Sequence, residues 1–155
     1  PPDWRSYGRP ERLPPQPPPG SLLPTVAEVG EERFLGLLEA ALGGLPALLT
    51  DPTGLGVLID RRLLDHLARD GRERFLAWLP DLVSRPQEIW LLPLRHGRRV
   101  TFRPHYVKVY RGSRDRHVLL VAEFHRGVLV GLTMLETGKY AYLQSKRAGF
   151  LRWPK

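Results

Sequence analysis

The spacing of apolar residues changes once along this chain of 155 residues, and that change limits the folds open to it. Before Pro86, apolar side chains recur every three or four residues, which is typical of amphipathic helices. After Pro86 they alternate, which is typical of strands with one buried face. Helices followed by a run of strands indicate an α+β fold. We therefore expect N-terminal helices packed on one face of an antiparallel sheet of four to five strands, with a C-terminal helix.

The predicted elements follow from this spacing and from the turn residues between them. Helices are expected at 31–42, 60–68 and 72–83, and Pro80 predicts that the third helix kinks or ends early near Trp78. A short strand at 55–59 precedes the second helix. The remaining elements are strands at 88–94, 106–111, 117–125 and 128–135, a helix at 139–147 and a short strand at 150–153.

The first twenty residues are rich in proline. Such segments favour an extended polyproline-like conformation and lack the apolar residues that build a core. We therefore expect a Pro-rich flexible tail or linker at 1–20 and a single α+β domain at 21–155. Because residue 1 is Pro and not Met, we also expect the chain to be a fragment or a processed piece of a longer protein.

The chain is strongly basic, with a net charge of +8 and a pI of about 10.4. Most of this charge comes from arginine, whose planar fork binds phosphate, so nucleic acid is the favoured partner. The alternative is the coding bias of a thermophile, because the chain has no Asn and one Met. Absent cysteine excludes disulfides and thiolate metal sites. No apolar stretch approaches the roughly 18–20 residues that span a bilayer, so no membrane partner is expected.

The register of the strands predicts which side chains share a face. Arg126 and Gly127 form a two-residue hairpin turn, which places Leu120 opposite Thr133. The preceding hairpin places Lys108 opposite Leu120. An open face that forms a cleft floor is then expected to carry Tyr106, Lys108, Tyr110, Ala122, Gly131 and Thr133. The helices are expected to cover the other face, with Val107, Val109, Leu119, Val121, Val128, Val130, Leu132 and Met134.

The last helix is an alternative occupant of that open face. If the last helix fills the space, Lys108 only extends its charged end to solvent. Other residues also have two interpretations. His66 is either catalytic or a helix-surface residue without a catalytic role. Trp90 either packs in the core or binds nucleic acid. The basic loop at 95–103 either binds a phosphate backbone or is simply solvated.

The residue types present are sufficient for metal-independent RNA cleavage. The chain has no His-Glu-x-x-His pattern, no glycine-rich phosphate loop and no Gly-x-Ser-x-Gly elbow. It does have His, Lys, Arg, Thr, Tyr and carboxylates. In such cleavage a base removes the proton of the ribose 2′-hydroxyl, an acid protonates the leaving 5′-oxygen and a cation stabilises the phosphorane. No metal and no cofactor are therefore expected.

The order of several motifs resembles a known family. The motifs are the stretch at 51–60 before His66, Pro86-Gln-Glu-Ile-Trp90, Tyr106-Val-Lys108, Thr133 and Tyr140-Ala-Tyr-Leu-Gln-Ser-Lys-Arg147. Over residues 45–153 the chain is similar to phage-borne nuclease-like domains of the barnase/EndoU/colicin/RelE group. Such domains often lie at the C-terminus of phage head-morphogenesis or portal-linked proteins. The family usually has a Thr-Phe pair on its last long strand, whereas Met134 follows Thr133 here.

The resemblance implies an RNase-like domain that cleaves RNA by 2′-hydroxyl attack. The catalytic residues that it implies are His66, Lys108, Thr133 and Arg147. His66 would be the base or acid, Lys108 and Arg147 would stabilise phosphate, and Thr133 would orient it. Residues expected to bind nucleic acid are Trp90, Arg98, Arg99, Arg103, Tyr106, Tyr142 and Lys146, with a base stacked on Tyr106 or Tyr142.

The resemblance also suggests partners and a setting. The expected partners are RNA or another nucleic acid, a larger phage structural protein in cis and an immunity protein. The expected location is the phage virion or the host cytoplasm, where the domain would act like a toxin. Two alternatives stay open at this point: a non-catalytic nucleic-acid-binding module and a structural virion domain on the same fold.

Overall fold

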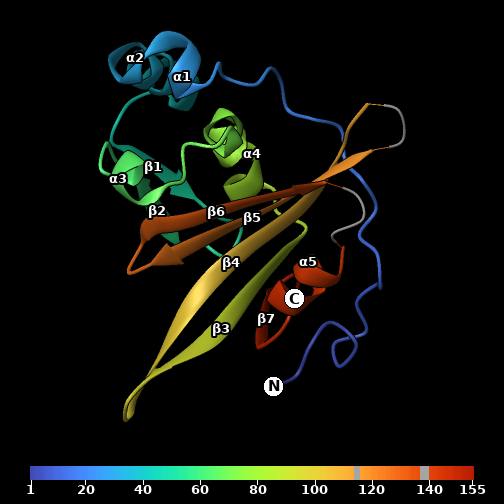
Figure 1. Ribbon diagram of the computed structural model, residues 1–155. Coiled ribbons are helices and arrows are strands. Elements are labelled where there is room, and N and C mark those ends of the chain that lie inside the picture. The colour runs from blue at the N-terminus through green and yellow to red at the C-terminus, as the bar shows by residue number, and fades with distance from the viewer. Residues whose placement is uncertain (114–115, 137–139) are drawn as a thin grey trace.

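The computed structural model describes residues 1–113, 116–136 and 140–155, with the backbone alone described for His66. Within these residues, seven strands form one sheet in the order β1-β2-β6-β5-β4-β3-β7 (Figure 1). The pair β2–β6 is parallel and the other neighbouring pairs are antiparallel. The strands are β1 (Ala47–Thr50), β2 (Gly56–Ile59), β3 (Glu88–His96), β4 (Arg99–Arg111), β5 (His117–His125), β6 (Val128–Glu136) and β7 (Phe150–Trp153). The predicted α+β class is confirmed, but the sheet is larger than predicted and mixed.

The helices lie on both sides of this sheet. They are α1 (Val26–Val29), α2 (Glu31–Leu42), α3 (Leu63–His66), the 3₁₀ helix η1 (Arg72–Trp78), α4 (Leu79–Ser84) and α5 (Tyr140–Lys146). Figure 1 shows α1 to α4 gathered on one side of the sheet, with α5 and the N-terminal segment on the other. Pro80 lies in the first turn of α4, where its missing N–H costs no helical hydrogen bond, so the predicted break near Trp78 is confirmed. Among the described residues, no helix has both the length and the apolar character needed to cross a bilayer.

Strand β4 is buried from both sides. All residues from Pro104 to Tyr110 are buried, and alternate side chains enter two different cores. Tyr106 and Tyr110 enter the large core under α1 to α4, and we call this side the helix-covered face. Val107 and Val109 enter a smaller core that includes Leu143 of α5, and we call this side the α5 face.

The assignment of the two faces corrects the sequence prediction. The face of Tyr106, Lys108 and Tyr110 was expected to be open, but it is the helix-covered face. The polar atoms on this face find partners there, because the Tyr106 hydroxyl donates to Asp51 and the Tyr110 hydroxyl donates to Asp81. Buried tyrosine is stable when its hydroxyl is satisfied, so this polar face becomes core.

The register between β5 and β6 also differs from the prediction. The turn at Arg126 and Gly127 is confirmed, and so is the predicted pairing of Lys108 with Leu120. A register shift between Glu123 and Phe124, however, inserts one extra residue into β6. Thr133 therefore lies opposite Val121 rather than Leu120, on the α5 face and across the sheet from Lys108.

The predicted basic loop at 95–103 is a regular hairpin. Strands β3 and β4 stay paired out to His96 and Arg99, and Gly97 makes the turn with a positive φ of 61°. Strand β5 pairs with β4 only from His105 onward. Residues 93–103 therefore form a two-stranded ribbon that extends beyond the rest of the sheet (Figure 1), and we call it the arm.

The proline-rich segment lies against the sheet. Leu13 is buried in the core of the α5 face. Gln16 pairs with the end of β4, where its N–H donates to the Val109 carbonyl (2.9 Å) and its carbonyl accepts from Arg111 (2.7 Å). This placement differs from the predicted flexible tail, because Leu13 supplies apolar surface that the sheet buries. The boundary between 1–20 and 21–155 stays a prediction.

A buried ion cluster ties this segment to both ends of the fold. Glu88 accepts two bonds from Arg147, at 2.6 Å from Nε and 2.9 Å from Nη2, and one from Arg9 at 2.7 Å. Trp90 donates its Nε1–H to the same carboxylate at 2.9 Å. Burial by itself would raise the pKa of Glu88, but these hydrogen bonds outweigh it and lower the pKa. The carboxylate therefore stays charged and joins β3, the end of α5 and the N-terminal segment.

We expect Glu88→Gln to lower the free energy of unfolding by about 3–5 kcal/mol, because the buried Arg147 would lose its negatively charged partner. Urea denaturation measures this change. The matched control is Glu136→Gln, which alters an exposed pair with Arg116 and should cost under about 1 kcal/mol. A pKa that is lower in the folded state stabilises the fold above the unfolded pKa, and this contribution is lost as the pH falls through the folded value. The difference in the free energy of unfolding between wild type and Glu88→Gln should therefore become smaller at acidic pH. Equal urea midpoints for the two proteins at neutral pH would contradict the role of Glu88 as a charged partner of Arg147.

Candidate active site

Three ionisable side chains meet on the α5 face where the last residues of β5 pair with β4. Arg103 and His105 are two residues apart on β4, so their side chains share one face. His105 lies directly opposite Glu123 of β5. Nη1 of Arg103 is 3.1 Å from Oε1 of Glu123, and Nε2 of His105 is 3.6 Å from the same oxygen. One carboxylate oxygen therefore faces both a permanent cation and an imidazole.

The environment of His105 keeps its ring neutral. The side chain is 2 % exposed, and Nδ1 lies 3.0 Å from the Arg103 carbonyl oxygen. Because a carbonyl only accepts, Nδ1 carries the proton and Nε2 faces Glu123. Burial lowers the pKa of His105 below its ordinary value, and the nearby charge of Glu123 only partly opposes this. The ring is therefore neutral at pH 7, with a free nitrogen beside the carboxylate.

The next strand leaves room beside this cluster. Gly131 lies opposite Glu123, and a Cβ built on it would be 3.6 Å from Oε2 of Glu123. Because glycine has no Cβ, this residue places no side chain against Oε2, and the Glu123 side chain is 25 % exposed. Thr133 lies two residues further along β6 on the same face and is partly exposed. A hydroxyl and a carboxylate thus share one stretch of sheet surface.

Helix α5 supplies an aromatic ring and a cation at the edge of the cluster. Leu143 is buried in the α5-face core and fixes the helix on the sheet. Tyr142 is 47 % exposed, and Nζ of Lys146 lies 5.5 Å from the centre of its ring. The positive charge of Lys146 contributes to lowering the pKa of His105, which places this ammonium within electrostatic reach of the cluster. Arg72 approaches from the edge of β6, where it donates to the Leu132 carbonyl at 3.3 Å.

Arg103 has hydrogen-bonding capacity left over. Its Nε and the Oγ1 of Thr101 are buried without a hydrogen-bond partner among the described residues. Buried polar atoms in native proteins are almost always paired with protein, water or ligand. A guanidinium binds carboxylate and phosphate through parallel hydrogen bonds from its fork. The Arg103 side chain is 25 % exposed, so an oxyanion from solvent can reach the outer part of its guanidinium beside Glu123, whereas the buried Nε is not accessible.

Comparison with known proteins agrees with this chemistry. The model of the PBECR2 family, described as phage-Barnase-EndoU-ColicinE5/D-RelE like nuclease2, matches residues 33–154. The chain belongs to this family. No curated protein and no solved structure matches the chain. The PBECR2 match confirms the resemblance seen in the sequence and assigns the domain a nuclease-type function in a phage context.

The PBECR2 fold brings some of the predicted site residues together. Those at or beside the Arg103–His105–Glu123 cluster are Arg103, Thr133, Tyr142 and Lys146. Arg98 and Arg99 lie exposed at the end of the arm. The side chain of His66 lies outside the part of the chain that the structure describes, and its backbone ends α3.

The other predicted residues lie elsewhere and are already paired. Lys108 is on the helix-covered face, where Nζ donates to Asp81 at 2.8 Å and to the Arg85 carbonyl at 2.7 Å. Tyr106 is buried on that face as well. Arg147 and Trp90 both bind Glu88 inside the molecule. These side chains hold elements together in this structure, because a buried charge or polar atom needs an internal partner.

Two residues of the cluster were missed from the sequence, namely His105 and Glu123. Their signal was present in the hairpin register, because pairing Tyr106 with Ala122 also pairs His105 with Glu123. His105 lies on the face that the sequence predicts to be covered by helices, where no site is expected. The Arg103–His105–Glu123 cluster therefore lies on the opposite face of the sheet from Lys108, where the sequence predicted the cleft.

The coupling between His105 and Glu123 gives a direct test of this geometry. The negative charge of Glu123 raises the pKa of His105 against the larger effect of burial. Glu123→Gln removes that charge, so the pKa of His105 should fall further below its ordinary value. Titration of the imidazole signals by NMR measures the shift. Glu136→Gln removes the same charge from an exposed position at the far end of β6 and should leave His105 unchanged; an identical titration in both variants would contradict the contact.

Proposed function

We propose that this domain is a metal-independent endoribonuclease that cleaves RNA by attack of the ribose 2′-hydroxyl on the adjacent phosphate. The observation that carries the proposal is the Glu123 carboxylate held beside Arg103 on a sheet face that also carries Thr133. A base and a phosphate-binding cation within one hydrogen bond of each other are what this reaction needs. The substrate supplies its own nucleophile, so position and charge are the remaining requirements.

Glu123 is the general base in this mechanism. Its Oε2 beside Gly131 accepts the proton of the 2′-hydroxyl as the 2′-oxygen attacks phosphorus. His105 acts as a positioning residue by packing alone, because it is almost fully buried and its ring lies 3.6 Å from the carboxylate. Its neutral Nε2 also leaves the carboxylate a strong acceptor, since no proton on that nitrogen competes for it.

The cations stabilise the charge that develops on the phosphate. Arg103 donates from its fork to the non-bridging oxygens, and the Thr133 hydroxyl donates to the same group. Lys146 gives a proton to the leaving 5′-oxygen, so one proton is taken by Glu123 and one is released by the ammonium. The products are a 2′,3′-cyclic phosphate and a 5′-hydroxyl. Tyr142 stacks a base of the bound strand.

Arg103→Ala should lower the cleavage rate of mixed RNA by roughly 10²–10³-fold, the scale for removing one electrostatic stabiliser. The wild-type protein should cut in EDTA, leave cyclic phosphate ends and leave DNA intact, because DNA lacks the reacting hydroxyl. Gel assays with end-group analysis measure these outcomes. Arg61→Ala is the matched control, because Arg61 is exposed beside Glu39 of α2 and should keep full activity. Binding without cleavage at every pH would instead favour a non-catalytic binding module, and cleavage only with added magnesium would refute the mechanism.

The identity of the base is tested by the pH profile of kcat/KM. Glu123→Gln should remove the acidic limb of the profile, because an amide cannot take up the proton. His66→Ala should keep that limb if Glu123 is the base. The sequence-based proposal assigns this role to His66, so a limb that disappears in His66→Ala and persists in Glu123→Gln would transfer the role to His66.

A further inference from the structure

We propose that the arm binds single-stranded RNA and that Phe102 and Phe150 form the surface on which bases of that strand stack. The inference rests on the proposed function and adds to it a preferred form of the substrate. The two rings are 50 % and 52 % exposed, and their centres are 5.7 Å apart with a tilt of 60°. Large apolar side chains gathered at the surface mark a binding site, and Val100 extends this one along β4 at 49 % exposure.

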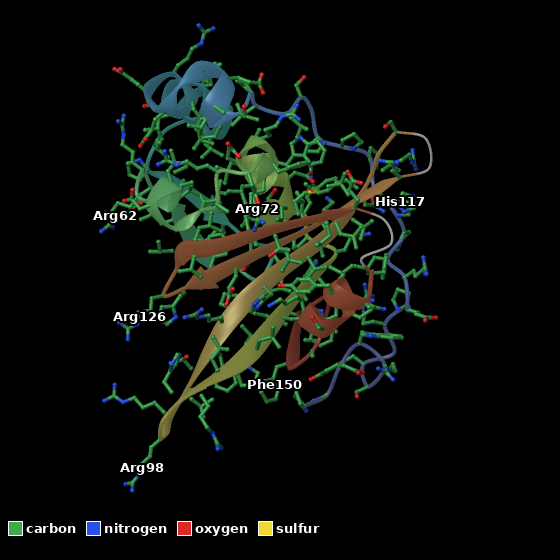
Figure 2. All side chains as sticks on the ribbon, viewed as in Figure 1. Arg62, Arg72, Arg98, His117, Arg126 and Phe150 are labelled. Atoms are coloured by element: carbon green, nitrogen blue, oxygen red, sulfur yellow. The ribbon has the colours of Figure 1, made fainter. Side chains whose placement is uncertain are left out.

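The charge around this patch selects an anionic partner. The sequence carries no Asp or Glu between Glu88 and Asp115, a stretch that includes the whole arm. Arg95, Arg98 and Arg99 are exposed near the patch. Figure 2 shows Arg98 pointing away from the body at the end of the arm, with Phe150 closer to the body. Aromatic surface bordered by arginine is the combination that binds single-stranded nucleic acid.

The backbone gives the strand a path from the cluster to this patch. Phe102 and Arg103 are neighbours on β4 and point to opposite faces of the ribbon. Because β5 begins its pairing at His105, the edge of β4 beside these two residues is not covered by β5. A flexible strand held at Arg103 can therefore pass around this edge and reach Phe102 within a short length.

The geometry favours a single strand over a duplex. In an A-form duplex the bases are stacked on each other and their faces are not accessible to side chains. Unpaired bases expose both faces, and stacking on aromatic side chains tolerates any base. The patch has two rings, so it suits adjacent unpaired nucleotides.

Fluorescence anisotropy with 2′-O-methyl RNA tests this inference separately from catalysis, because that RNA has no nucleophile to cleave. The probes are a single strand of roughly 12 nucleotides and a hairpin duplex of the same composition. Phe102→Ala with Phe150→Ala should weaken binding of the single strand about ten- to a hundredfold and leave the duplex nearly unchanged. Phe102→Trp should retain single-strand binding. Leu48→Ala removes an apolar side chain that is 71 % exposed on β1 and should have no effect.

Each outcome decides the inference without deciding the nuclease. Unchanged single-strand binding in the double variant, or an equal loss for strand and duplex, would overturn it even if the wild-type protein cleaves RNA. Weaker binding of the single strand with unchanged binding of the duplex would support the inference even if the wild-type protein does not cleave RNA. Circular dichroism of the double variant confirms the fold, because both rings lie at the surface and their removal leaves the buried cores intact.

Discussion

Burial of β4 on both faces is the constraint on which the other elements depend. The strand carries four polar side chains within its buried stretch, and each requires an internal partner. Tyr106 reaches Asp51 in the turn before β2, Lys108 and Tyr110 reach Asp81 of α4, and His105 donates to the Arg103 carbonyl within β4 itself. The two aspartates come from segments far from β4 in sequence. One strand therefore fixes where α4 and the β1–β2 hairpin can lie.

Local signals in the sequence were sufficient for much of the fold. The break at Pro80, the turn at Gly127 and the pairing of Lys108 with Leu120 follow from neighbouring residues, and all three are present. The orientation of the sheet was not predictable in the same way. Tyr and Lys are read as solvent-facing until a distant carboxylate is known to meet them, and Asp81 lies 27 residues from Lys108.

The candidate site depends on the β-bulge between β5 and β6, which the alternation of apolar and polar residues does not predict. An extra residue in β6 places Gly131 beside Glu123 and turns Thr133 toward the α5 face. A regular ladder would have put this hydroxyl among the buried side chains under the helices. Arg103, Thr133, Tyr142 and Lys146 were candidates from the sequence, Thr133 through the family resemblance, whereas the pair of His105 and Glu123 needed the correct face. β-Bulges are frequent beside active sites because they redirect a side chain in this way.

The internal ion pairs have a consequence for how relatives of this domain diverge. Lys108 with Asp81 and Arg147 with Glu88 hold charges that the fold itself requires. Selection for folding alone is expected to preserve these pairs, or to replace both members together, even in a lineage whose enzyme has decayed. Arg103, Glu123 and Thr133 carry no comparable structural duty on their partly open face. If the proposed function holds, drift at those three positions, rather than at the buried interior cations, would mark descendants that have lost RNA cleavage and kept the fold.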